Sequence, residues 1–340
     1  MPERKQLLQF FEGKASLPDC FKFTDKQLAE AKDSEDPIHS LSLSSFDPRL
    51  FRGWSIRSMT LDLLIIDEAS MLGGLELAKL NKIATTILLI GDPNQLAPIK
   101  SNGMSLNYVD QNFHLSKVRR QAENSGVLTL AYSVLKGTRS PSQLLAMAKT
   151  LPDIHVVDHF PKKALWQFPA LCWRNESRIQ IYMAWREAEG LPKNKLVENE
   201  PLICTGAKNS EVFTNGSRWF ISDPTPFKTT IKVRDEMGDV DVMTNAIISE
   251  HPSFKGADKV PKFKAGYGGA YFRHGAAITI HSSQGGQYPA SLIYFDDIVA
   301  AYHSSKVKDA GGLMLWQRLF YVAVTRAEKK VYLITSMEVK

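Results

Sequence analysis

Two apolar runs that each end in a short polar cluster constrain the fold more than any other feature. The first run, residues 61–66, stops at Asp67 and Glu68, and the second, residues 86–90, stops at the Gly-Asp-Pro-Asn-Gln of residues 91–95. Continuous runs of β-branched residues and leucine are typical of parallel strands covered on both faces. Chemistry in open α/β sheets gathers beyond the carboxyl ends of the strands. The sequence therefore predicts two buried strands with a site at one sheet edge.

The polar residues at this edge suit triphosphate chemistry. One of two adjacent carboxylates can hold Mg²⁺ while the other polarises a water, and a neutral amide such as that of Gln95 can sense a terminal phosphate. A lone Asp-Glu pair is weak evidence, because acidic residues commonly cap the helix after a strand. Here the second cluster follows at a distance that allows one intervening helix, residues 74–82. The two clusters together are a specific signal.

These clusters resemble motifs II and III of superfamily 1 helicases, and later stretches narrow the resemblance to the RecD-like branch that includes Dda. The resemblance covers about residues 37–340. It implies an α/β fold of two RecA-like parallel-sheet domains, the first truncated at its N-terminus, with a small SH3-like β insertion in the second. It also implies ATP and Mg²⁺ between the domains: Asp67 would bind Mg²⁺, Glu68 would activate water and Gln95 would sense the γ-phosphate.

Three further motifs follow in the family's order. Residues 113–121 resemble motif IV, in which Arg120 occupies the position of an arginine that reaches the γ-phosphate. Residues 319–327 resemble motif VI, where Arg326 matches another γ-phosphate arginine. Residues 276–286 resemble motif V, whose Gln-Gly lies near the triphosphate and whose preceding residues hold a nucleic-acid strand. The matching residues are Gln284 and Gly285 for the nucleotide and Thr279, His281, Ser282 and Ser283 for the strand.

The stretch from residue 254 to residue 274 is a second candidate for nucleic-acid binding. Five basic residues, Lys262 and Lys264 among them, are interleaved with aromatic residues against a single acid, Asp258. Basic groups spaced among aromatics suit a single strand, whose phosphates are neutralised while its bases stack. A polar loop whose aromatics fold back on the small β domain remains an equal alternative.

The remaining pattern gives the elements and the domain boundaries. Helices are expected over residues 4–11, 24–31, 127–136 and 178–188, the last capped by Asn175, and strands over 201–205, 213–221, 229–233, 240–243, 276–280 and 331–334. Asn-Gly at 215–216 is a strong hairpin signal. We expect a first RecA-like domain at 1–110, the second at 111–205 and 275–340, and the β insertion at 206–274.

A phosphate-binding loop is the one expected part that the sequence does not supply. The only candidate is Gly13-Lys14, but Leu8 takes the place of the loop's first glycine and Ala15 that of its Mg²⁺-binding Ser or Thr. The chain is therefore expected to lack motif I and the first βα unit. Three hypotheses remain: a 5′-to-3′ DNA helicase completed by a second polypeptide, a non-catalytic nucleic-acid-binding or scaffold protein derived from a helicase, and an unrelated α/β protein.

Composition sets broader limits. The chain of 340 residues has no run of about 18 apolar residues, which argues against a membrane span. Its three cysteines are far apart and form no Cys-x-x-Cys pair, so a disulfide framework or zinc site is not indicated and a reducing cytosol is expected. The family resemblance implies the cytoplasm of a bacterial or phage-infected cell. The net charge of +6 is compatible with polyanion binding. The resemblance implies single-stranded DNA as a partner, together with a second polypeptide that supplies the phosphate-binding loop or proteins of replication or recombination.

Overall fold

The computed structural model describes twelve parts of the chain, which are residues 61–98, 104–109, 125–136, 139–161, 163–192, 196–207, 213, 216–227, 230–238, 241–245, 270–304 and 312–337. Several expectations lie outside these residues. They are the helices at 4–11 and 24–31, the Gly13-Lys14 candidate, motif IV with Arg120, and Lys262 and Lys264 of the basic stretch.

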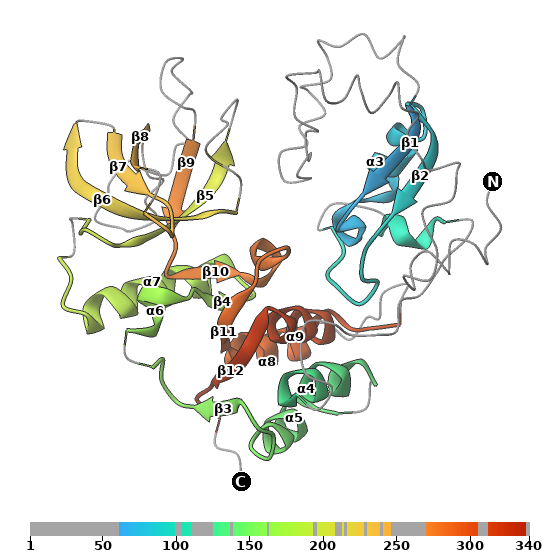
Figure 1. The fold of residues 1–340 in the computed structure, drawn as a ribbon. Helices are drawn as coiled ribbons and strands as arrows, with labels where there is room; N and C mark the ends of the chain where they lie inside the picture. The colour runs from blue at the N-terminus through green and yellow to red at the C-terminus, as the bar shows by residue number, and fades with distance from the viewer. Residues whose placement is uncertain are drawn as a thin grey trace.

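The first parallel sheet contains the two predicted strands. β1 (Leu61–Ile66) and β2 (Ala84–Leu89) are parallel neighbours, and α3 (Gly74–Leu80) connects them (Figure 1). Leu77 and Leu80 of α3 pack with Ile66 in one apolar cluster. The prediction that both faces are covered is wrong for the described residues, because Ile65 on the opposite face is 56% exposed. Only the face toward α3 is covered there.

The second parallel sheet has five strands in the order β10-β4-β11-β12-β3. Their bounds are Ala277–Thr279, Ala170–Cys172, Tyr288–Tyr294, Ala327–Ile334 and Ile154–Val157, respectively. Side chains alternate between the faces, as the two-residue period of a strand requires. Leu171, Ile293 and Leu333 face one apolar cluster, and Leu292 and Ile334 face the other.

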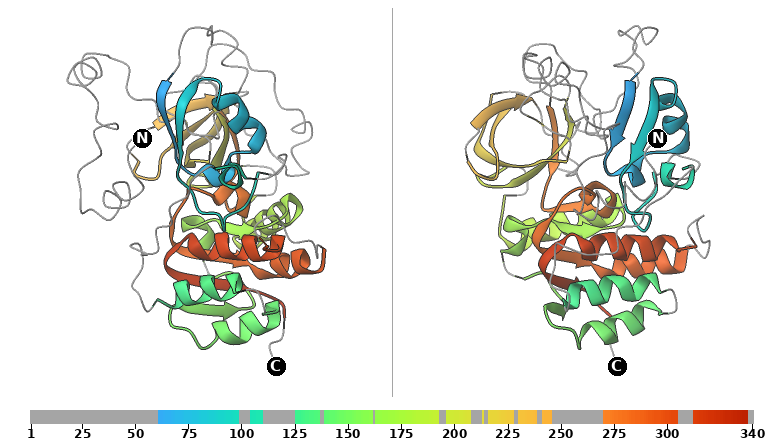
Figure 2. Two further views of the ribbon diagram at one scale, coloured as in Figure 1. Left: turned by 90° about the vertical axis from the view of Figure 1, so that its right-hand side faces the viewer. Right: turned by 45° about the vertical axis from the view of Figure 1, so that its right-hand side comes forward.

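Helices cover both faces of this second sheet (Figures 1 and 2). One face packs against α4 (Gly126–Leu135), α5 (Pro141–Ala148), α8 (Phe295–Ser304) and α9 (Leu315–Thr325). The other packs against α6 (Ala164–Gln167) and α7 (Asn175–Ala188). The expected strand at 276–280 ends at Thr279, where η6 (Ile280–Ser283) begins. No helix in the described parts of the chain is long and apolar enough to cross a membrane.

An antiparallel sheet is inserted between β4 and β10 and curls on itself (Figure 2). Its order is β8-β7-β6-β5-β9, with bounds Asp241–Asn245, Thr230–Arg234, Arg218–Phe227, Pro201–Ala207 and Ala270–His274. It begins at Pro201 rather than at residue 206, because β5 pairs with β6 over residues 201–203 and with β9 over residues 202–207. Gly216 has a φ of +85° and donates to the carbonyl of Cys204 at 2.8 Å, which fits the predicted Asn-Gly turn.

The start of α7 differs from the expectation. Asn175 is the first helical residue and Arg174 is the N-cap, so the prediction that Asn175 caps the helix is wrong. Asp297 of α8, which is fully buried, instead holds the residues that lead into the helix, because it accepts hydrogen bonds from the backbone N–H groups of Trp173 (2.8 Å) and Arg174 (3.0 Å). The same carboxylate pairs with the Arg174 guanidinium at 2.7 Å and accepts from Ser177 at 2.8 Å.

Replacing Asp297 with Ala should therefore lower the free energy of unfolding by about 3 kcal/mol or more, because buried donors at the start of α7 lose their acceptor. Urea denaturation measures the difference. Asp158→Ala is the matched control, since that carboxylate is 85% exposed and should leave the midpoint unchanged. Equal stability of the two variants would show that Asp297 does not stabilise the segment leading into α7.

Candidate functional site

The carboxylates of the first cluster stand at the end of β1. Asp67 is exposed, and its Oδ1 accepts a hydrogen bond from the backbone N–H of Glu68 at 2.8 Å. Glu68 has φ 51° and ψ 38°, a left-handed conformation that is uncommon for a residue other than glycine and concentrates at functional sites. Ala69 donates to the carbonyl of Ile90 at 2.8 Å, which holds the ends of β1 and β2 side by side.

The second cluster forms a tight loop after β2, residues 91–98, here called the β2 loop. Asp92 Oδ1 accepts from the backbone N–H of Asn94 at 2.9 Å, and Gln95 N–H donates to the Asp92 carbonyl at 3.1 Å. Gly91 allows this close approach, because a Cβ there would lie 3.0 Å from the backbone nitrogen of Ser70, a tight contact. The two polar clusters therefore meet at one sheet edge, as predicted.

The β2 loop is anchored in the second parallel-sheet domain. Arg318 of α9 is 4% exposed, and its Nη1 donates to the carbonyl oxygens of Pro93 (2.5 Å) and Gln95 (2.7 Å). Tyr321, one turn later, donates its hydroxyl to Asp92 Oδ2 at 2.7 Å, and burial raises the pKa of this hydroxyl, so it stays a donor. Leu96 is 1% exposed and belongs to the apolar core around α4, α8 and α9.

Three residues that motifs III, V and VI singled out lie along this junction. Gln95 is buried, and its Oε1 accepts from Nε2 of Gln284 at 3.4 Å, while Gln284 also donates to the Leu96 carbonyl at 3.3 Å. Arg326 is buried at the end of α9, and its Nη1 donates to the Gly286 carbonyl at 3.0 Å. Gly285 beside it has a φ of +80°, which favours glycine.

The residues that follow β10 divide into outward and inward groups. Thr279 caps η6: its Oγ1 accepts from the Ser282 N–H at 3.3 Å and lies 2.9 Å from the exposed Ser282 hydroxyl. Ser283 is 1% exposed, and its hydroxyl donates to the Ile280 carbonyl at 2.8 Å. The expectation that Ser283 offers a contact to a nucleic-acid strand is therefore wrong, because the short helix turns it inward. His281 is half-buried, and burial lowers its pKa.

The side chains that follow β1 are suited to bind Mg²⁺ together with a phosphate group. Asp67 offers hard oxygen ligands, and its only described contact is the one from Glu68 N–H. Ser70 nearby has a fully buried hydroxyl without a hydrogen-bond partner among the described residues, so polar capacity is left unfilled at this edge. No group of three or more His, Cys, Asp or Glu that could enclose a metal occurs in the described residues. Mg²⁺ is commonly held by one or two carboxylates plus phosphates, and Asp67 could supply such a carboxylate.

Sequence reasoning missed Arg318 and Tyr321, the two residues that hold the β2 loop. A usable signal was present: Arg318 stands in α9 among Trp316, Leu319 and Phe320, which are all buried. A guanidinium on the apolar side of a helix needs hydrogen-bond acceptors from elsewhere in the fold. That signal points to a partner without identifying it.

Two family models match the chain. The first, described as an AAA domain, matches residues 23–159, and the second, described as a UvrD-like helicase C-terminal domain, matches residues 274–334. No curated protein sequence matches the chain.

Among solved structures, the Pif1 helicase from Bacteroides in complex with ADP-AlF3 and ssDNA is similar at 14% identity, a TM-score of 0.50, and coverage of 98% of this chain and 79% of that one. A second Pif1 structure, solved in a study of unwinding at forked dsDNA, has 14% identity, a TM-score of 0.49, and coverage of 89% and 75%.

The fold and the two matched domains define a helicase-type α/β protein, and the expected pair of RecA-like parallel-sheet domains is confirmed. The matched AAA domain at residues 23–159 and the matched UvrD-like helicase C-terminal domain at residues 274–334 support the expected resemblance to superfamily 1 helicases.

Truncating Leu96 to Ala should lower the free energy of unfolding by about 2 to 4 kcal/mol, because the side chain fills the core of a domain other than its own. Urea denaturation measures this. Leu75→Ala is the matched control, since Leu75 is 59% exposed. If both variants lose a similar, small amount of unfolding free energy, Leu96 does not anchor the β2 loop.

The stability of the fold should also depend on pH through His281. Its pKa is lower in the folded state than the ordinary value of about 6.5, so the unfolded chain binds the proton more readily. The free energy of unfolding therefore contains the full contribution of a neutral His281 above about pH 6.5. That contribution is lost as the pH falls below this value. His281→Gln should flatten the pH dependence of the thermal midpoint, whereas His303→Gln, at an exposed position, should not.

Proposed function

We propose that this helicase-family chain couples ATP hydrolysis to 5′-to-3′ movement along single-stranded DNA and so unwinds duplexes. The observation that carries the proposal is the anchoring of the β2 loop. The loop that carries Gln95 is fixed to α9, and Arg326 is the residue directly after the last residue of α9. A change at the nucleotide edge of the first sheet is thereby transmitted to the second domain.

Each residue of the candidate site would have a separate role in binding or hydrolysing the nucleotide. Asp67 would hold Mg²⁺, which when bound neutralises charge on the transferred phosphoryl group. Glu68 would orient and deprotonate the attacking water, with the left-handed backbone fixing its direction from the strand end. Gln95 and Gln284 would report the terminal phosphate across the junction. Arg326 would exchange its contact with the Gly286 carbonyl for a phosphate oxygen.

The strand would be gripped by the outward side of the segment after β10. Thr279 and Ser282 carry hydroxyls on the exposed side of η6 that suit phosphate oxygens of a strand backbone. Closing and opening of the two domains would alternate the strength of this grip. The basic stretch at 254–274, with Lys262 and Lys264, would add a second grip.

A non-catalytic scaffold that binds nucleic acid is the second candidate. It is favoured by one observation: the Arg326 guanidinium is occupied by the carbonyl oxygens of Gly286 and Val322 rather than directed freely toward a nucleotide. The two candidates differ in whether the carboxylates at β1 perform chemistry.

The test is DNA-stimulated ATP hydrolysis with and without a supplied phosphate-binding loop. The 340-residue chain alone should hydrolyse ATP slowly, because the printed sequence has no complete Gly-x-x-x-x-Gly-Lys-Ser/Thr loop. Fusing a strand, loop and helix of this type ahead of Met1 should raise the rate, and Glu68→Gln in the fusion should abolish it. Duplexes with a 5′ or a 3′ single-stranded tail then report the direction of unwinding.

Glu76→Gln in α3 is the control for a carboxylate lost elsewhere in the same sheet unit. A folded fusion without activity would favour the scaffold, and a Glu68→Gln fusion with full activity would refute the assigned base. Rapid hydrolysis by the unfused chain would place the phosphate-binding loop within residues 1–60.

A further inference from the structure

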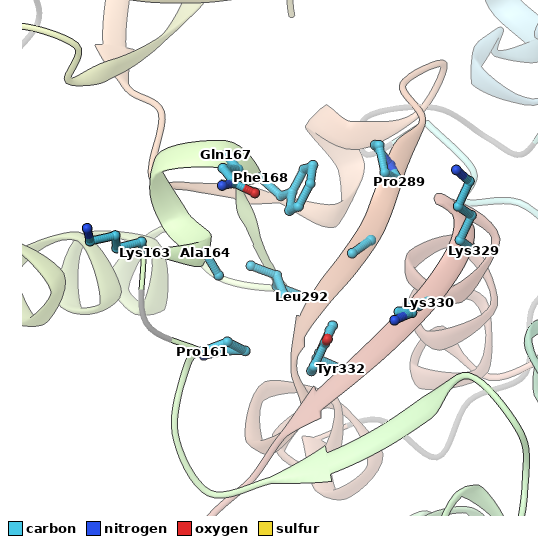
Figure 3. Close-up of a pocket in the computed structure, with 11 residues that line it drawn as sticks. Pro161, Lys163, Ala164, Gln167, Phe168, Pro289, Leu292, Lys329, Lys330 and Tyr332 are labelled. Carbon is cyan, nitrogen blue, oxygen red and sulfur yellow. The ribbon is translucent and has the colours of Figure 1, made fainter.

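A hollow on the second parallel sheet is separate from the junction described above. It has a volume of about 350 Å³ and lies between α6 and the strands β11 and β12 (Figure 3). Phe168, Leu292 and Tyr332 lie around its middle, with Lys163 at one end and Lys329 and Lys330 at the other. Asp67, Gln95, Gln284 and Arg326 do not line it.

A β-bulge brings two successive lysines to this hollow. Tyr288 pairs with Ala327, but Ala290 pairs with Lys330, so β12 uses one residue more than β11 over this interval. Successive residues of a regular strand point to opposite faces, whereas a bulge redirects the residues within it. Lys329 and Lys330 consequently both line the hollow.

The positive charge of the hollow is not neutralised by the described protein. Its lining contains three lysines and no carboxylate. All three lysines are exposed, and none has an ion-pair or hydrogen-bond partner for its ammonium group in the described parts of the chain. Like charges gathered around one concave surface raise the local concentration of anions.

The walls of the hollow are braced before any ligand arrives. Tyr332 stacks on His155 of β3 with ring centroids 4.8 Å apart. Arg218, from the antiparallel sheet, donates to backbone carbonyls of α6, including that of Trp166 at 3.0 Å and that of Gln167. A site with fixed walls loses little conformational entropy on binding.

We propose that this hollow binds a segment of single-stranded DNA, with phosphates at Lys329 and Lys330 and a base against Phe168 or Tyr332. Cationic groups beside aromatic rings are the chemistry that holds single strands without base preference. A volume at the low end of ligand pockets admits a nucleotide unit rather than a duplex. The choice of single-stranded DNA as the ligand rests on the proposed function. The residues of the hollow, however, are separate from η6 and from the basic stretch at 254–274.

The test is fluorescence anisotropy with a labelled oligothymidylate at about 50 and 200 mM salt, the range in which phosphate contacts are exposed. The Lys329→Ala/Lys330→Ala variant should bind more weakly. The slope of log affinity against log salt should fall by about 0.7 for each phosphate contact, hence about 1.4. Lys79→Ala/Lys82→Ala, which removes the same charge at α3 and the turn after it, should leave this slope unchanged.

Phe168→Leu provides a second readout, because it keeps an apolar side chain but removes the ring. It should weaken binding by about fivefold or more without changing the salt slope, as loss of stacking does. If the lysine variant keeps the wild-type salt slope and Phe168→Leu keeps the wild-type affinity, the inference about the hollow is wrong, while the proposed function is unaffected. Absence of DNA binding by the wild-type chain would overturn the proposed function as well.

A competitor of different chemistry separates nucleic acid from an acidic protein partner. Poly-glutamate should displace the oligothymidylate only at a much higher concentration of charge. If poly-glutamate displaces it as efficiently from the wild-type chain, and the lysine variant abolishes that displacement, the hollow is a site for acidic protein segments and the inference is wrong.

Discussion

The buried guanidinium of Arg318 is the interaction on which the arrangement of the two parallel sheets depends. A buried cation is tolerated only where hydrogen bonds replace its water, and here two backbone carbonyls of the β2 loop do so. Moving the loop away from α9 would leave that charge without these acceptors. The Tyr321–Asp92 hydrogen bond and the insertion of Leu96 act in the same direction. The β2 loop therefore moves with the second domain although it belongs in sequence to the first.

Local sequence patterns predicted the elements that local chemistry determines. The strands at 61–66 and 86–90 and the helix between them follow from apolar runs and their spacing, and the structure contains all three. The start of α7 did not follow, because Asn175 is a good capping residue, whereas Asp297, the carboxylate that binds the residues leading into the helix, lies more than a hundred residues later. Ser283 was misassigned for a related reason: the turn after Thr279 decides which hydroxyl faces inward.

The candidate site likewise contains residues that the sequence predicted and residues that it did not. Gln95, Gln284 and Arg326 were predicted to belong to one site because each lies in a motif with its own residue pattern, and the structure places them along one junction. Arg318 and Tyr321 were missed because their partners are backbone carbonyls and a carboxylate on another domain. The lysines of the hollow were missed because a strand register depends on pairing with β11, which a single segment of sequence does not record.

The bonds from Arg218 to α6 have a mechanical meaning. This side chain starts from the first residue of β6 and reaches three successive carbonyls at Leu165, Trp166 and Gln167. Hydrogen bonds loaded together resist a pull better than bonds that break one after another. Tension applied to the antiparallel sheet would thus reach α6 directly, as well as through the covalent connections at its ends. The antiparallel sheet is therefore joined to the second parallel-sheet domain by side-chain hydrogen bonds as well as by its covalent connections, so the two should move together.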